Sequence, residues 1–167
     1  MQIEAIRQYL TMFMNAVAEN TTGAEIAETE DGPVLYCAVK SPFEGQDDIG
    51  YQITMLPYAD TIFAAEIVMF VFTGIDKQKL KDIGTLINRL NQYLTLGNYR
   101  VFEEDGSVMF CHGMMLDEEM QITDINELMS KTITVMEDTV VNTGDYILRL
   151  LNGEELSSVI EEVGKGE

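Results

Sequence analysis

The stretch DKQKLKDIGTLINRLNQYLTLGNYRVFEEDGSVMFCHGMML, from Asp76 to Leu116, decides the fold class. Its first half has apolar residues at helical spacing: Leu80, Ile83, Ile87, Leu90 and Leu94. Asp76 is a residue type that caps helix N-termini, and Gly97 is the type that most often follows a helix C-terminus. The pattern predicts an amphipathic helix that begins after Asp76 and is stopped at Gly97.

The second half of this stretch predicts a β-hairpin. Residues 99–102 and 108–110 are strand-like, and Asp105–Gly106 supplies a tight turn between them. The three acidic residues of the EEDG sequence should keep that turn exposed. We expect the outgoing strand to continue through Met114 and Leu116.

The strand expected at 62–72, IFAAEIVMFVF, is apolar on both of its faces except at Glu66. An antiparallel sheet with one face in water normally alternates apolar and polar residues. We therefore expect both sides of this strand to be covered. Helices would cover one side, and either more helix or a second subunit would cover the other.

The N-terminal region predicts a helix followed by a hairpin. Apolar residues at helical spacing indicate an amphipathic helix over residues 2–19. Residues 24–40 follow as two strands, with Asp31–Gly32 providing the positive-φ positions of the turn.

A loop and a half-buried strand come next. Residues 41–50 contain proline and glycine among polar residues, which is typical of a loop. Phe43 within it is expected to fold back onto the core, with an exposed contact residue as the alternative. Residues 51–55 alternate as a strand, and Pro57 should end that strand or place it at an edge.

The C-terminal region predicts a long helix that Thr123 can cap. A β-branched stretch that contains Gly144 makes a kink or break plausible there. Residues 153–167 can add a short terminal helix. The chain is thus predicted to be one α+β domain over residues 1–167, an antiparallel sheet with helices in the order α-β-β-β-β-α-β-β-α.

Composition and charge exclude several classes of function. The chain has 167 residues and a formal net charge of −19, which disfavours nucleic acids and anionic membranes. This charge indicates a solvated acidic surface, or alternatively a basic partner. No signal peptide is evident, and the longest apolar run is about half of a membrane span. We expect a cytoplasmic protein.

Catalytic and metal-binding signatures are missing from the sequence. His112 is the single histidine, and no partners stand at ligand spacing. Cys111 is its neighbour, and on a strand neighbouring side chains point to opposite faces. Cys37 and Cys111 are expected to be core thiols, with a redox pair as the alternative. We expect no cofactor, no metal and no enzymatic activity.

The eleven methionines are either core filler or part of an adaptable apolar contact surface. The residues expected to form such a surface lie on the first helix, the strand at 62–72 and the second hairpin. They are Met12, Met14, Val68, Phe70, Phe72, Met109, Met114 and Met115.

The segment LINRLNQYLTLGNY, followed by VFEEDGSVMF, resembles the YbjN family, which is labelled as bacterial sensory transduction regulators and whose fold is similar to that of type III secretion chaperones. The matching residues are Leu86, Asn88, Leu90, Asn91, Gly97, Tyr99, Asp105, Gly106, Val108 and Phe110. The resemblance implies a small cytoplasmic protein without catalytic residues. It also implies a protein that is often dimeric and that holds another polypeptide or takes part in regulation.

Three functional hypotheses follow. The first is a non-enzymatic module that binds protein or peptide, with a chaperone-like or regulatory role, as a homodimer. The second is a small-molecule sensor with a pocket between sheet and helices, lined by Tyr51, Phe63 and Phe70. The third is an enzyme that uses Cys37 or His112.

Overall fold

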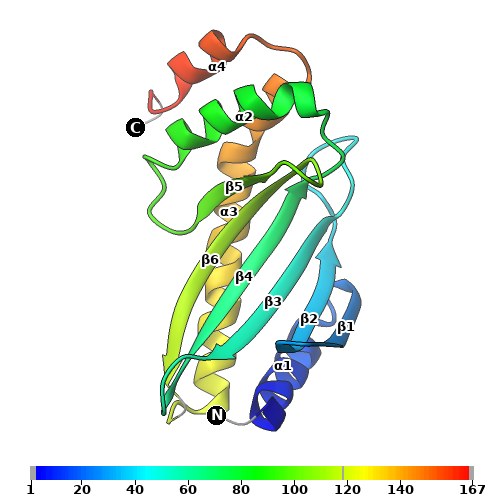
Figure 1. Cartoon of the computed structure of the whole chain (residues 1–167), viewed down its shortest axis with the longest axis vertical. Helices are drawn as coiled ribbons and strands as arrows, with labels where there is room; N and C mark the ends of the chain where they lie inside the picture. Colours follow the sequence, from blue (N-terminus) through cyan, green and yellow to red (C-terminus); the bar gives the residue numbers. More distant parts are fainter. Residues whose placement is uncertain (1–2, 118, 166–167) are drawn as a thin grey trace.

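The computed structural model describes residues 3–117 and 119–165. It is an α+β fold in which helices pack on an antiparallel sheet, as the sequence predicts (Figure 1). The elements in chain order are α1 (Ile3–Val17), β1 (Thr22–Thr29), β2 (Gly32–Val39), β3 (Ile49–Pro57), β4 (Ile62–Phe72), α2 (Lys77–Leu90), β5 (Asn98–Phe102), β6 (Ser107–Asp117), α3 (Ile122–Leu151) and α4 (Leu156–Glu162).

The six strands are ordered β1-β2-β3-β4-β6-β5, and every neighbouring pair is antiparallel. The first four strands follow one another as successive hairpins. After β4 the chain passes through α2 to β5 at the far edge, and β6 then returns between β5 and β4. The stretch Asp76–Leu116 therefore supplies the two strands at one edge of the sheet.

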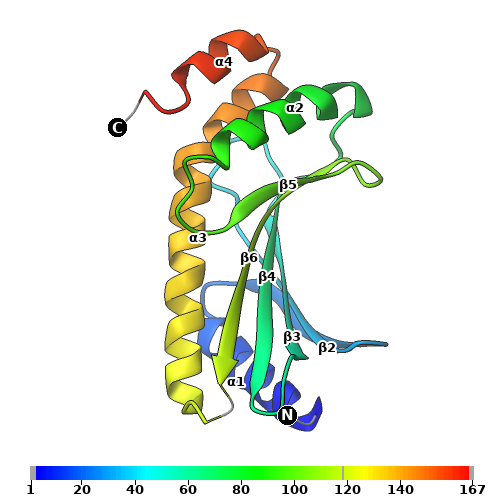
Figure 2. The same ribbon diagram turned by 60° about the vertical axis from the view of Figure 1, so that its left-hand side comes forward.

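Helices cover one face of the sheet, which we call the inner face. Figure 2 shows α1 and α3 on that side, with α2 and α4 at one end of the sheet. The inner face of β4 consists of alternate residues such as Phe63, Ile67 and Met69, none of which is exposed. From α1, Ile6, Leu10 and Phe13 pack into the same core. One helical layer and one sheet thus share one core.

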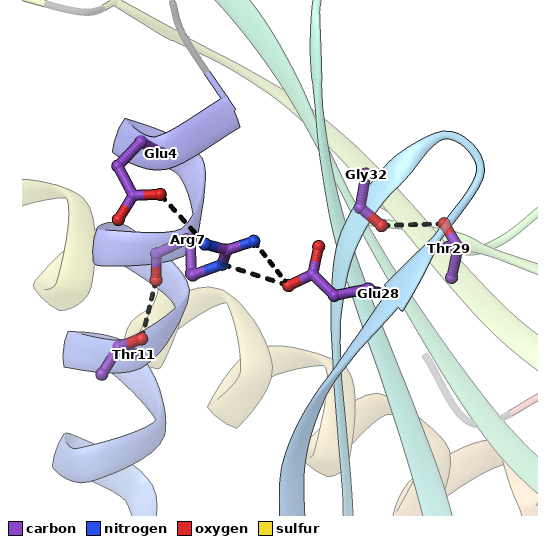
Figure 3. Close-up of polar contacts among 6 residues, drawn as sticks. All are labelled: Glu4, Arg7, Thr11, Glu28, Thr29 and Gly32. Atoms are coloured by element: carbon purple, nitrogen blue, oxygen red, sulfur yellow. Dashed lines mark hydrogen bonds and ion pairs between the residues drawn. The ribbon is translucent and has the colours of Figure 1, made fainter.

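Polar contacts join α1 to the first hairpin (Figure 3). The Arg7 guanidinium pairs with Glu28 on β1 at 2.9 Å and with Glu4 one turn earlier at 3.0 Å. Across the hairpin turn, the Thr29 hydroxyl donates a hydrogen bond to the Gly32 carbonyl at 2.8 Å. These groups are partly exposed, so each ion pair stabilises the fold by less than about 1 kcal/mol. The main effect of these contacts is to fix the position of α1 beside β1, and they add little to the stability of the fold.

The helix α2 begins as predicted and ends earlier than predicted. The Asp76 carboxylate accepts a hydrogen bond from the Gln78 backbone N–H at 2.8 Å, which caps the first turn. The helix ends at Leu90, so the prediction that Gly97 stops it is wrong. Asn91 instead exchanges two hydrogen bonds with the backbone of Tyr99, at 2.8 and 3.0 Å. This side chain fixes the end of α2 to β5.

Gly97 has a different role, at the start of β5. Its φ is 72°, and a Cβ there would lie 2.7 Å from the Phe110 ring and 2.9 Å from the Cys111 carbonyl oxygen. Glycine is therefore required because β5 approaches β6 too closely for a side chain. The predicted hairpin over these strands is confirmed, with residues 103–105 exposed in its turn.

The N-terminal predictions are mostly confirmed. The helix α1 spans Ile3–Val17, two residues shorter than expected at its end, and residue 2 lies outside the described residues. The turn of the first hairpin has a positive φ at Gly32 and not at Asp31. Phe43 is 8% exposed, with its ring centroid 5.2 Å from that of Phe72, so it folds back onto the core as predicted.

The long C-terminal helix α3 differs from its prediction in two details. It begins at Ile122 with Gln121 at the N-cap position, so Thr123 is not the cap. It also continues through Gly144 without a break. The Phe43 ring packs where a side chain at position 144 would lie, so this glycine makes room for a tertiary contact. Residues 156–162 form the predicted short terminal helix α4.

Candidate functional site

The face of the sheet opposite the helices, which we call the outer face, is one of two candidate sites. In the part of the chain that the structure describes, no helix lies over this face, which is turned toward the viewer in Figure 1 and seen edge-on in Figure 2. Val68 and Phe70 of β4 point to it and are half-buried. Met115 on β6 is 57% exposed and Leu56 on β3 is 46% exposed. Helices thus cover one side of β4, as predicted, and the described chain leaves the other side open.

The outer face is poor in charge for a chain of net charge −19. On the described residues of the four central strands β2, β3, β4 and β6 and the edge strand β5, the charged outward-facing residues are Glu66, Arg100 and, at the end of β6, Asp117. The other edge strand, β1, adds Glu25. The side chains of Glu66 and Arg100 pair at 3.6 Å. The centre of the face is therefore nearly neutral, with apolar residues on β4 and β6 beside the polar Gln52 and Thr54 of β3.

The eight residues predicted as a contact surface do not lie on one face. Val68, Phe70, Met109 and Met115 lie on the outer face, as their strand pairing shows. The other four lie elsewhere. Phe72 is 2% exposed and packs in the core, Met114 is on the inner face, and Met12 and Met14 are on α1.

The second candidate site is a cavity of about 530 Å³ on the other side of the sheet. Its walls come from the C-terminal part of α1, the inner faces of β2, β3 and β4, and the middle of α3. Most of the lining is apolar, and a few polar groups reach it. The residues with most bearing on its chemistry are Phe13, Cys37, Tyr51, Met69, Glu137 and Val140.

A short hydrogen bond crosses this cavity wall from sheet to helix. The Tyr51 hydroxyl on β3 donates to Oε1 of Glu137 on α3 at 2.6 Å. Burial, and then the neighbouring carboxylate, raise the pKa of Tyr51 above its ordinary value, so the phenol keeps its proton at neutral pH. Burial and Glu137 also raise the pKa of the Cys37 thiol. Around this hydrogen bond the cavity thus combines an apolar wall, two neutral donors and one carboxylate. Its other polar groups come from Asn20, Thr21, Lys40, Ser130 and Thr134.

The pocket residues predicted from the sequence are only partly correct. Tyr51 lines the cavity, but Phe63 is buried in the core without lining it, and Phe70 lies on the outer face. Glu137 was missed. The signal for it was available, because Glu137 stands between Ile133 and Val140 on the apolar side of the last helix, where a charge is unusual.

The structure does not bring Cys37 and His112 together. Cys37 lies on β2 and His112 on β6, with β3 and β4 between them, which separates the two strands by about 14 Å. Catalytic partners must come within about 3 Å. Burial raises the pKa of Cys111 and lowers the pKa of His112. Cys37 and His112 therefore form no catalytic dyad with one another.

Two further features bear on function. Over residues 3–117 and 119–165, the acidic, histidine and cysteine side chains form no group of three or more that could hold a metal ion. Among these same residues, none of the helices has both the length and the apolar character that crossing a bilayer requires.

Comparison with protein-family models finds no match to this chain, and comparison with curated protein sequences finds none either. The resemblance to the YbjN family therefore stays a prediction.

Proposed function

We propose that this chain is a non-enzymatic protein-binding module and that its outer face binds a second copy of the chain. The observation that supports the proposal is a sheet face with apolar residues on β4 and β6 that no helix of the described chain covers. An antiparallel sheet whose second face stayed in water would be expected to place polar residues there. On this face β3 does place the polar Gln52 and Thr54, but β4 and β6 place the apolar Val68, Phe70 and Met115.

The size of the outer face fits this occupant. Five strand spacings of about 4.8 Å and a strand of nine residues such as β3 give a face of roughly 700 Å². A standard protein interface buries about 800 Å² on each partner. Two copies joined face to face would therefore bury an area typical of a stable complex.

The charge of the outer face also favours a second copy. Two chains of net charge −19 repel one another at long range, but salt screens that repulsion beyond about 8 Å at physiological ionic strength. At short range, each face presents the Glu66–Arg100 pair, which is nearly neutral. A strongly basic client would find few acidic residues on this face. A chaperone-like or regulatory role in the cytoplasm, with a further polypeptide held by the dimer, is the broader function that the resemblance suggests.

The proposal is tested by sedimentation velocity of the wild type and two variants. Met115→Glu places a charge on the outer face at a side chain that is exposed in one protomer, so the protomer should still fold. Val135→Glu makes the same change at a 46% exposed position on α3 and is the matched control. We expect a dimer for the wild type and the control, and at least tenfold weaker dimerisation for Met115→Glu. A monomeric wild type, or equal behaviour of both variants, would refute the proposal.

A second candidate function, a small-molecule-binding domain, is favoured by a separate observation, the cavity between sheet and helices. The two functions are compatible because the cavity and the outer face lie on opposite sides of the sheet.

A further inference from the structure

The cavity has the dimensions and lining of a ligand site. Its volume of about 530 Å³ falls within the range of about 300–1,000 Å³ that small-molecule sites occupy. Phe13, Met69 and Val140 contribute apolar surface from three different elements. Such sites usually combine an apolar wall with a small number of polar groups that orient the ligand. The polar groups of this cavity therefore indicate which kind of ligand would fit.

Glu137 is the charged group that faces this cavity from the middle of α3, where Ser130 and Thr134 also line it. Its Oε1 accepts the hydrogen bond from Tyr51, which orients the carboxylate toward the sheet. Within the residues that the structure describes, Oε2 of the same carboxylate accepts no hydrogen bond, so it can accept one from a ligand. Burial keeps both Tyr51 and Cys37 uncharged at neutral pH, because their pKa values are raised. Glu137 therefore supplies the only negative charge among these three groups.

The remaining charged group of the cavity lining is Lys40. Its side chain is exposed, so its charge is largely solvated at the edge of the cavity. The net charge of −19 also creates a negative potential around the molecule, which attracts cations and repels anions. Both the local carboxylate and the overall field thus favour a positive ligand.

We propose that the cavity binds a small amphipathic cation, a molecule with an apolar body and one protonated amine that donates a hydrogen bond to Glu137. The apolar body packs against the walls from α1, the sheet and α3, and the amine reaches the free oxygen of the carboxylate. The inference rests on the second candidate function and adds the ligand class and the residue that selects it.

The test is titration of the full chain at neutral pH, followed by ¹H–¹⁵N correlation spectra, with three probes of similar size. They are 2-phenylethylamine, which is cationic, 3-phenyl-1-propanol, which is neutral, and 3-phenylpropionate, which is anionic. We expect saturable shifts with the amine at residues around the cavity, weaker binding of the alcohol and no binding of the acid.

Two variants assign the selectivity. Glu137→Gln keeps the shape of the side chain and removes its charge, and we expect about 10- to 100-fold weaker binding of the amine. Asp138→Asn removes the same charge from the next residue of α3, which is exposed, and should leave the affinity unchanged. The spectra of the free variants show whether each one is folded.

The outcomes separate the ligand class from the function. Equal binding of amine and alcohol, or an amine affinity that Glu137→Gln does not change, would overturn the cation assignment and leave a small-molecule site. Equal losses for Glu137→Gln and Asp138→Asn would show attraction by net charge alone and also overturn it. Binding of none of the three probes would overturn the small-molecule function itself.

Discussion

The contact between Gly144 and Phe43 gives the sharpest prediction about the fold. Gly144 is buried in the C-terminal third of α3, and the Phe43 ring from the β2–β3 loop packs against it. A Cβ at position 144 would lie 3.1 Å from Cε2 and 3.3 Å from Cε1 of Phe43, and closer still to Cζ. Ordinary carbon contacts are about 3.5–4.0 Å, so Gly144→Ala must displace the ring.

Two effects of Gly144→Ala oppose each other. Alanine is favoured over glycine inside a helix by about 1 kcal/mol. Overpacking of a core costs about 1–3 kcal/mol. That cost applies here because the Phe43 ring also packs against Phe72 and cannot move away freely. In the wild-type background the substitution should therefore be neutral to destabilising by about 2 kcal/mol. In a Phe43→Leu background, where the ring atoms are gone, the same substitution should stabilise by about 1 kcal/mol.

The assay is urea denaturation of the wild type, the two single variants and the double variant, followed by circular dichroism. All four are measured at one protein concentration, since association changes apparent stability. In the double-mutant cycle the contribution of helix propensity to the free energy cancels, because it is the same in both backgrounds. We expect a coupling free energy of about 1–3 kcal/mol between positions 43 and 144. An equal stabilisation by Gly144→Ala in both backgrounds would refute the contact.

Three further predictions concern β5, the end of α2 and Tyr51. Gly97→Ala should destabilise the fold by about 2–4 kcal/mol in the same denaturation assay, because Gly97 has a φ of 72° and β6 lies close to it. The control is Gly84→Ala on α2, where a side chain meets open space, and this substitution should stabilise the fold by about 1 kcal/mol. Asn91→Leu should lower the free energy of unfolding by about 2–4 kcal/mol, since it leaves the buried backbone of Tyr99 without two hydrogen bonds. A loss below about 0.5 kcal/mol, which is typical of surface substitutions, would contradict this prediction. Because the pKa of Tyr51 is raised, the folded chain keeps a proton that the unfolded chain loses above about pH 10, so stability falls as the pH rises. The difference in unfolding free energy between the wild type and Tyr51→Phe should therefore shrink by about 1.4 kcal/mol between pH 8 and pH 11. An unchanged difference would contradict this prediction.

Local signals in the sequence predicted most of the fold. The spacing of apolar residues in α1 and α2, the Asp76 cap and the turn at Gly106 depend on neighbours in the chain, and all are confirmed. The end of α2 was predicted wrongly because it depends on a tertiary partner. Asn91 leaves the helix to bind the backbone of β5, and sequence alone does not show that β5 lies within its reach.

The same limit explains the long last helix. Its β-branched residues and Gly144 favour a break when they are considered locally. The helix is nevertheless continuous, and Phe43, about a hundred positions earlier, fills the space beside the glycine. The prediction that Phe43 folds onto the core was correct, but its partner on α3 could not be named.

The candidate sites were predicted unequally. The strand at 62–72 was expected to need cover on both sides because both of its faces are apolar, and the structure shows that the helices of the chain cover one side. The cavity could only be predicted in outline. Its position depends on the distance between α3 and the sheet, which no periodicity encodes, so Tyr51 was found and its partner Glu137 was not.

The central claim, that a second copy covers the outer face, is tested most directly by the methionine methyl groups. Met115 on the outer face is 57% exposed in one protomer, and Met12 on α1 is 42% exposed on the opposite layer. A soluble gadolinium chelate broadens the ¹³C-methyl signals of methionines that solvent can reach. At a concentration where the wild type is dimeric, the account predicts strong broadening of Met12 and protection of Met115. Broadening of Met115 equal to or greater than that of Met12 would contradict it.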